Sequence, residues 1–186
     1  MQPKIILLFS GKRKSGKDYL TDHLKDRLGD KCEIIKISQP IKSHWAKEKK
    51  LNLNELLSDS AYKEQYRLDM IKWSEEMRNK DYGYFCRAAC DNAAVKDVWI
   101  VSDIRRKTDI QWFQETYGNL VRKVRIIADE ETRKARGFRF QTGVDDAMSE
   151  CDLDDFKDWD LIINNGDGRH QLKEQLDIII NLIPNL

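Results

Sequence analysis

The chain of 186 residues lacks features that define several large classes of protein. No apolar run approaches the ~20 residues that cross a bilayer, so we expect no membrane partner. Its 33 Lys and Arg face 32 Asp and Glu, and a formal charge of +1 argues against nucleic-acid binding. With only three Pro and no repeat, low-complexity tract or linker, the sequence predicts a single domain over residues 1–186.

Two common kinds of chemical site are missing as well. The four cysteines form no C-x-x-C pair, which excludes the usual zinc spacing and suits a reducing compartment. No Ser-His-Asp pattern exists, and the histidines are scattered at His23, His44 and His170. Lys4 already lies at the first predicted strand, so no signal peptide is expected, and the ending Pro-Asn-Leu does not match a Ser-Lys-Leu address. We therefore expect a cytoplasmic protein.

The most informative stretch is Lys4–Leu20, with the sequence KIILLFSGKRKSGKDYL. A buried-type apolar run ends in a glycine-bounded basic loop, after which helical spacing begins at Lys17. The spacing matches the phosphate-binding P-loop, with Gly11, four intervening residues, Gly16 and Lys17. In a P-loop, backbone N–H groups and a helix N-terminus converge on an anion. The alternative is a solvated basic hairpin.

One position departs from the general P-loop pattern. Asp18 stands where Ser or Thr would bind Mg²⁺ through a hydroxyl. A carboxylate beside a triphosphate is repulsive unless a cation lies between them. Asp18 is therefore a direct or water-bridged Mg²⁺ ligand, or it is an argument against the site.

Strands and helices alternate along the chain, which predicts an α/β fold. A three-layer α/β/α P-loop kinase fold with a five-stranded parallel sheet and a small mobile lid is expected. The predicted strands are Ile5–Phe9, Glu33–Ser38, Asp97–Ser102, Leu120–Ala128 and Asp160–Asn164. The predicted helices are Lys17–Leu28, Pro40–Lys50, Leu53–Ser58, Tyr62–Lys80, Tyr84–Ala94, Thr108–Tyr117, Asp129–Phe140 and Arg169–Leu182.

The third predicted strand leads into a second candidate for phosphate chemistry. Ligands bind at the carboxyl ends of parallel strands, where Asp103 is positioned to hold Mg²⁺ and Arg105 and Arg106 to clamp phosphate. The first and third loops should meet at the same edge of the sheet. The alternative is that Asp103 caps a helix while both arginines pair with surface acids.

Further cations are expected to serve an anionic acceptor or a lid. The long helix after residue 61 carries Lys63, Arg67 and Arg78, each of which is alternatively part of a solvated face. Residues 130–146 combine a basic helix containing Arg136 with Gly143 and an acidic pair, typical of a lid that closes over phosphates.

These features together indicate phosphoryl transfer from a Mg²⁺-nucleotide to an acceptor that itself carries phosphate. Another small-molecule or nucleotide kinase of the same fold would account for the loop and the lid equally well. A regulator that binds ATP without transferring phosphate is a third possibility, although it leaves Arg105 and Arg106 without a role.

Beyond these general patterns, the sequence resembles the animal phosphomevalonate kinases over nearly its whole length. The resembling segments are LLFSGKRKSGKD (Leu7–Asp18), YKE (Tyr62–Glu64), DMIKWSEEMR (Asp69–Arg78), FCR (Phe85–Arg87), VSDIRR (Val101–Arg106), TGVDDAMSEC (Thr142–Cys151) and LKEQL (Leu172–Leu176). In this family the unusual Asp18 is a regular feature of the loop.

The resemblance implies ATP-dependent phosphorylation of (R)-5-phosphomevalonate in isoprenoid and sterol synthesis, by a protein that we expect to be monomeric. Its catalytic candidates are Lys17, Asp18 and Arg105, and its Mg²⁺ candidates are Asp18 and Asp103. It implies ATP contacts by Lys12, Arg13, Lys14, Ser15, Gly16, Lys17, Asp18, Arg136, Gly166 and Gln175. It implies substrate contacts by Arg105, Arg106 and Asn165, which the cations Lys63, Arg67 and Arg78 would support. At Gly166 only a backbone contact is possible.

Overall fold

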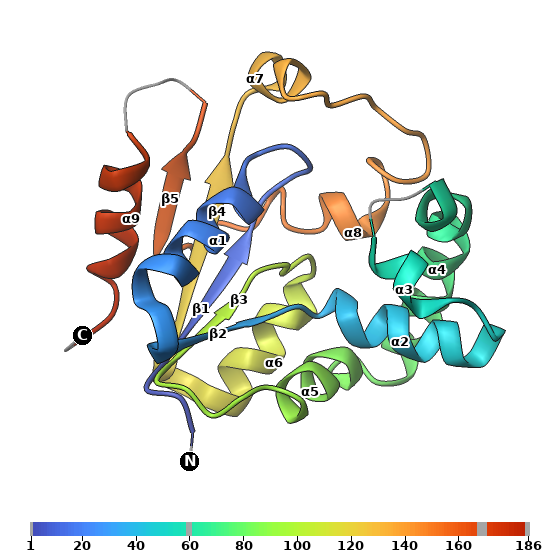
Figure 1. The fold of residues 1–186 in the computed structure, drawn as a ribbon, viewed down its shortest axis with the longest axis horizontal. Helices are drawn as coiled ribbons and strands as arrows, with labels where there is room; N and C mark the ends of the chain where they lie inside the picture. The colour runs from blue at the N-terminus through green and yellow to red at the C-terminus, as the bar shows by residue number, and fades with distance from the viewer. Residues whose placement is uncertain (1, 59–60, 167–170, 185–186) are drawn as a thin grey trace.

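A parallel sheet forms the centre of the computed structural model (Figure 1). The structure describes residues 2–58, 61–166 and 171–184. Within these residues the sheet has five strands in the order β2-β3-β1-β4-β5, which confirms the predicted parallel α/β fold. The strands are β1 (Ile5–Ser10), β2 (Cys32–Ile35), β3 (Val98–Val101), β4 (Val121–Ile127) and β5 (Leu161–Asn164).

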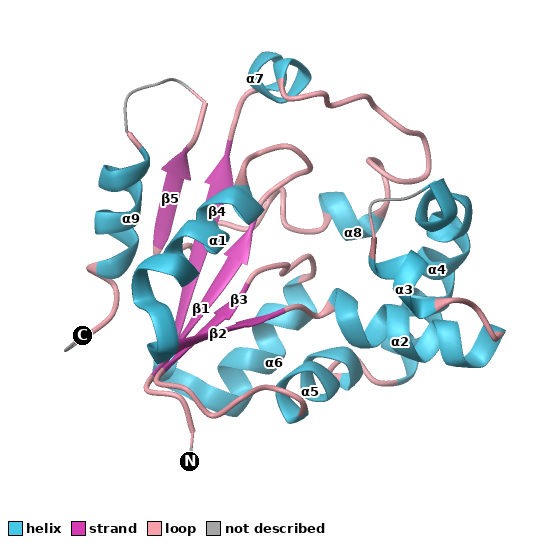
Figure 2. Cartoon of the chain, viewed as in Figure 1, coloured by secondary structure: helices cyan, strands magenta, loops and turns pink. Residues whose placement is uncertain are grey.

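The alternation of side chains along β1 explains the three layers. Ile5, Leu7 and Phe9 pack on one face with α1 (Lys17–Leu28) and α9 (Leu172–Ile180). Ile6 and Leu8 pack on the other face with α5 (Tyr84–Asp91) and α6 (Lys107–Tyr117). Because helices cover both faces of the sheet (Figure 2), the strand is apolar from Ile5 to Phe9 rather than alternating, and only Ser10 at its end is polar.

Three helices form a smaller unit beside the carboxyl ends of β2 and β3 (Figure 1). They are α2 (Ser38–Lys49), α3 (Leu53–Leu57) and α4 (Ala61–Lys80). Their shared core contains Trp45, Leu56 and Met70, with Tyr66 and Trp73 packed against it. This unit places α4 across from the loop that follows β1.

The predicted helix Asp129–Phe140 is wrong in its length. Helix α7 (Glu130–Ala135) ends well before Phe140, because Gly137 takes a left-handed φ of 84° and the Phe138 amide turns back to the Arg133 carbonyl. The chain then runs irregularly to α8 (Met148–Cys151), a single turn too short to leave a periodic signal. Two short 3₁₀ turns, Gly29–Lys31 and Gly118–Leu120, complete the described elements.

Other boundaries differ by a few residues. Strand β2 ends at Ile35, and Ser38 belongs to α2 rather than to the strand. The predicted turn after Asn165 and the predicted helix start at Arg169 fall partly outside the described residues, and α9 is described from Leu172. No helix within the described ranges combines the length and apolarity needed to cross a bilayer.

Two buried cysteines lie one helical turn apart on α5. Cys86 and Cys90 lie on the buried side of α5, in the same core cluster as Ile6 and Leu8 of β1. Burial raises the pKa of Cys90 to about 12, so its side chain is a neutral thiol at physiological pH.

We predict that Leu24→Ala destabilises the protein far more than Leu57→Ala. Leu24 joins α1 to the sheet and is 0% exposed, so truncation removes buried area and leaves a cavity worth about 2–5 kcal/mol. Leu57 is 44% exposed on α3, and the same substitution there should change stability by about 0.5 kcal/mol or less. Urea unfolding measures both, and equal effects would contradict the described core.

Candidate active site

The loop between β1 and α1 lines a cleft of about 550 Å³ at the carboxyl edge of the sheet. Residues 11–19 form one wall, while Glu64 and Arg67 of α4 and Arg105 after β3 complete it. Because β1 and β3 are hydrogen-bonded neighbours, their following loops lie side by side. The predicted meeting of the first and third loops at one edge is thereby confirmed.

Both P-loop glycines are required by close contacts. A Cβ on Gly11 would lie 2.6 Å from Ser15 Oγ and 2.8 Å from the Ile126 carbonyl oxygen. Gly16 has φ 89°, and a Cβ there would lie 2.1 Å from Asn165 Nδ2. Lys14 also has a left-handed φ of 64°, so left-handed residues recur along the loop as they do in anion-binding backbone nests.

Lys17 is the first helical residue after the loop, and its ammonium is buried at the floor of the cleft. Its Nζ donates to Asp18 Oδ1 at 2.6 Å and to the Ser102 carbonyl oxygen at 2.5 Å. Burial alone would raise the pKa of Asp18, but the charge and hydrogen bond of Lys17 outweigh that effect and lower it. Asp18 is therefore a carboxylate at neutral pH, and its side chain is exposed at the cleft.

Two adjacent arginines follow β3 and are fixed through their backbone by one buried carboxylate. Asp109, at the third position of α6, accepts from the backbone amides of Arg105 and Arg106 at 3.2 and 3.1 Å. The Arg105 guanidinium lines the cleft and pairs with Glu150. The Arg106 guanidinium is buried and pairs with Glu75 of α4.

The predicted acceptor cations on α4 are separated by the structure. Arg67 lines the cleft and pairs with Glu64. Arg78 is not brought to this cleft, because its guanidinium is buried in an ion pair with Asp109. The side chain of Lys63 lies outside the described part of the structure.

Asp103 is placed as the alternative expectation describes, at the start of a helix. Its two carboxylate oxygens accept from the backbone amides of Ile37 and Ser38, at 2.7 and 2.9 Å. The first amides of α2 have no partner within the helix, and Asp103 satisfies them. In this structure it ties the end of β3 to α2 and does not line the P-loop cleft.

The residues predicted on the nucleotide side gather at the far end of the P-loop. Arg136 donates to the carbonyl oxygens of Ser15 at 3.0 Å and Asn165 at 2.6 Å. Asn165 Nδ2 also donates to the Ser15 carbonyl oxygen, at 2.9 Å, and Gln175 donates to Asn165 Oδ1 at 3.3 Å. Gly166 adjoins them and accepts from the Thr132 hydroxyl. Asn165 thus lies beside the P-loop rather than beside Arg105 and Arg106.

The basic loop residues are held by two acids, of which the sequence patterns noted only one. Lys12 pairs with Asp154 at 2.6 Å, and Arg13 pairs with Asp145 at 2.9 Å. Arg133 of α7 donates to the Arg13 carbonyl oxygen at 2.8 Å. Of these acids, only Asp145 lies within a motif noted in the sequence, where it was assigned to the lid.

Three buried side-chain oxygens have no hydrogen-bond partner within the described residues. Each belongs to a residue that lines the cleft or bonds to a residue that does. They are Ser15 Oγ, Ser102 Oγ and Asp145 Oδ1. A buried polar atom without a partner costs about 1–3 kcal/mol, and such atoms concentrate where a ligand or water completes the bonding. Of these three residues only Ser15 lines the cleft, which combines backbone amides, cations and this hydroxyl in an arrangement that can bind polyanions.

The chain was compared with known proteins. Residues 9–119 match the family model described as phosphomevalonate kinase. A protein of Drosophila melanogaster named phosphomevalonate kinase is 50% identical over 181 residues, covering 95% of each chain.

Solved structures under 25% identical agree in fold alone. A Thermus thermophilus protein, TT1252, matches all of both chains with a TM-score of 0.58 and 15% identity. A gluconokinase from Sinorhizobium meliloti matches all of this chain and 97% of its own, with a TM-score of 0.51 and 12% identity. From its family-model match and its half-identical relative, this chain belongs to the phosphomevalonate kinase family.

Proposed function

We propose that this protein transfers the γ-phosphate of ATP to (R)-5-phosphomevalonate, giving 5-diphosphomevalonate and ADP in isoprenoid and sterol synthesis. The observation that carries the proposal is one cleft lined by both the P-loop and Arg105. The P-loop supplies the amides and the lysine that bind a nucleoside triphosphate, and Arg105 supplies a second phosphate-binding group. We further propose that the enzyme is a cytoplasmic monomer.

The acceptor chemistry requires little from the protein beyond charge and position. The acceptor is a phosphate monoester whose last pKa lies near ~6, so it is largely ionised at pH 7 and needs no strong general base. Transfer is direct and in line, without a phosphoenzyme. Lys17 neutralises charge that develops on the transferring group, while Arg105 and Arg106 hold the acceptor phosphate. For that role the buried Arg106 has to exchange Glu75 for the substrate.

Mg²⁺ accompanies ATP in this proposal. The exposed carboxylate of Asp18, ionised and adjacent to Lys17, is the oxygen ligand that fits a hard cation. Asp103 fits less well, because both of its oxygens already accept backbone amides. When bound, Mg²⁺ supplies positive charge against the phosphate oxygens.

Residues 130–146 act as a lid in this proposal. Arg133 and Arg136 already contact P-loop carbonyl oxygens, which limits how far this segment lies from the nucleotide site. Arg136 moves from these carbonyls to the phosphates of ATP when the lid closes and excludes water.

The activity itself is tested by ADP release from purified protein with ATP, Mg²⁺ and (R)-5-phosphomevalonate. A panel of nucleoside monophosphates and sugar acids serves as alternative acceptors. Turnover with phosphomevalonate well above the panel is expected. ATP binding without turnover of any acceptor would instead support the regulator, and preference for another acceptor would reassign the substrate.

We predict that Lys17→Met lowers kcat steeply. The substitution removes a buried ammonium that acts on transition-state charge, at a cost of about 2–4 kcal/mol, or roughly 30- to 1000-fold in rate. Lys31→Met, an exposed lysine at the opposite edge of the sheet, is the matched control and should leave kcat unchanged. Steady-state kinetics at saturating ATP measures both, and wild-type kcat in Lys17→Met would refute this role.

We predict that Arg106→Met raises the KM for phosphomevalonate more than the KM for ATP. The lost charge-assisted contacts should cost about 2–4 kcal/mol, mostly in acceptor binding. Arg87→Met breaks a comparable arginine–carboxylate pair with Asp81 on the surface and serves as the control. Equal changes in the two KM values would show that Arg106 supports the fold and not the acceptor.

A further inference from the structure

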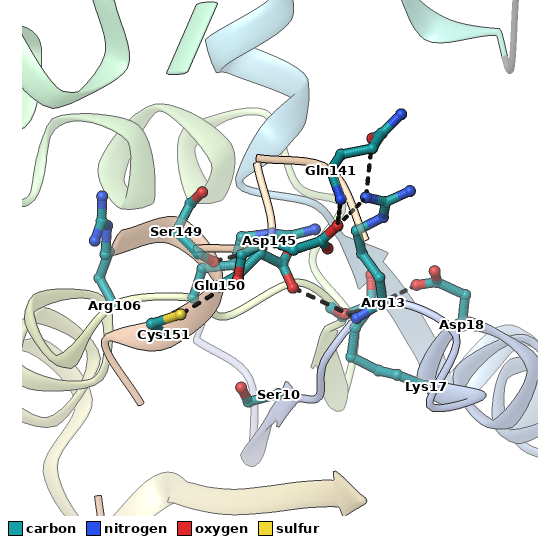
Figure 3. Close-up of polar contacts among 12 residues, drawn as sticks. Ser10, Arg13, Lys17, Asp18, Arg106, Gln141, Asp145, Ser149, Glu150 and Cys151 are labelled. Atoms are coloured by element: carbon teal, nitrogen blue, oxygen red, sulfur yellow. Dashed lines mark hydrogen bonds and ion pairs between the residues drawn. The ribbon is translucent and has the colours of Figure 1, made fainter. Parts of the chain in front are cut away.

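An acidic belt, residues 141–154, crosses the carboxyl edge of the sheet and contacts both phosphate-binding loops (Figure 3). Asp145 Oδ2 accepts from Arg13 Nη1 at 2.9 Å and from the Gln141 amide at 2.8 Å. Asp154 pairs with Lys12 near the end of the belt. These contacts hold the belt against the P-loop.

Glu150, on α8 in this belt, is the acid that contacts both loops. Its Oε1 pairs with Arg105 Nη1. Its Oε2 accepts from the Arg13 backbone amide at 3.4 Å (Figure 3). The carboxylate side chain is only 5% exposed, whereas the Arg105 side chain is 39% exposed. A buried acid therefore fixes one end of a guanidinium whose remainder faces the cleft.

The backbone around Glu150 is fixed independently of that side chain. The Cys151 thiol donates to the Asp145 carbonyl oxygen at 3.3 Å, and Asp152 accepts the Lys107 amide at the start of α6 at 2.8 Å. The Ser149 carbonyl oxygen accepts a long bond from Arg105 Nη1 at 3.4 Å. The carboxylate is consequently presented by a braced turn and not by a free loop.

We propose that Glu150 is a positioning residue that orients the Arg105 guanidinium toward the acceptor and couples it to the P-loop. The inference rests on the proposed function, since it assigns Arg105 to the acceptor phosphate. Both hydrogen bonds of Glu150 and Ser149 to the guanidinium use Nη1. Among the described residues none accepts from Nε or Nη2, so these donors remain for binding phosphate, and the contact with Arg13 sets their distance from the donor loop.

The sign of the effect separates positioning from simple competition. A carboxylate beside a phosphate site repels the ligand, so if Glu150 only competed for Arg105, its neutralisation would improve acceptor binding. If it positions the guanidinium, neutralisation frees an arginine side chain that has considerable rotamer entropy, and both binding and rate become worse. The two roles therefore predict opposite changes in kcat/KM.

The test is Glu150→Gln, which keeps the shape of the side chain and removes its charge. We expect kcat/KM for phosphomevalonate to fall about 10- to 100-fold, with a smaller change for ATP. Asp155→Asn, which breaks an exposed ion pair with Lys107, is the matched control and should retain full activity. An unchanged or improved kcat/KM in Glu150→Gln would overturn the proposal.

A double variant shows whether Glu150 acts through Arg105. If it does, Glu150→Gln/Arg105→Met should lie within about twofold of Arg105→Met alone, because the partner is already gone. Independent losses that multiply would indicate a general structural role and contradict the inference. Thermal unfolding of each variant confirms that the compared proteins are folded.

A nuclear magnetic resonance measurement keeps this test separate from the proposed function. The Nη–H signal of Arg105, whose Nη1 donates to Glu150, is assigned by its loss in Arg105→Met and should be a distinct, slowly exchanging peak in the wild type. In Glu150→Gln its chemical shift should move toward that of a free arginine, and its intensity should fall. If the wild type fails to phosphorylate phosphomevalonate, the proposed function fails, yet an unchanged Arg105 signal would still overturn the role of Glu150.

Discussion

Cations gathered at one edge of the sheet repel each other, and most of the contacts in this site offset that repulsion. Lys12, Arg13, Lys17, Arg67 and Arg105 all line one cleft, and without compensation their charges would oppose each other. Each has an acidic partner, namely Asp154, Asp145, Asp18, Glu64 and Glu150 respectively. Desolvation nevertheless lowers the pKa of Arg105, and the nearby cations add to the effect. The fold thus holds a cluster of cations that can bind polyanions.

Three of these five pairs join segments far apart in the chain, so compensation also assembles the site. Lys12 and Arg13 lie in the P-loop and Arg105 follows β3, whereas Asp154, Asp145 and Glu150 come from the acidic belt. In the proposed reaction, binding two phosphorylated ligands would replace some of these internal pairs with phosphate contacts. Such exchange favours charge-assisted bonds of fixed geometry, which Arg105 supplies better than a lysine would.

The sequence predicted the fold and the position of the P-loop because both depend on local patterns. An apolar strand, the glycines Gly11 and Gly16, and helical spacing from Lys17 leave a periodic signal that needs no knowledge of distant contacts. Asp103 could be predicted only as one of two alternatives, since a carboxylate after a strand can hold a metal or cap a helix. The structure gives it the amides of Ile37 and Ser38. The ion pairs of Asp109 with Arg78 and of Glu150 with Arg105 were missed because they span 31 and 45 residues, although Asp109 also accepts the nearby amides of Arg105 and Arg106.

In the proposed reaction, donor and acceptor phosphates occupy one cleft, and the phosphoryl group passes directly between them. The stereochemistry at the transferred phosphorus tests it, using ATP made chiral at the γ-phosphorus with sulfur and oxygen isotopes. One in-line displacement between two ligands in the same site predicts inversion of configuration in the 5-diphosphomevalonate product. Retention would require two displacements through a phosphorylated residue, and it would contradict the account of a cleft that only binds, orients and neutralises.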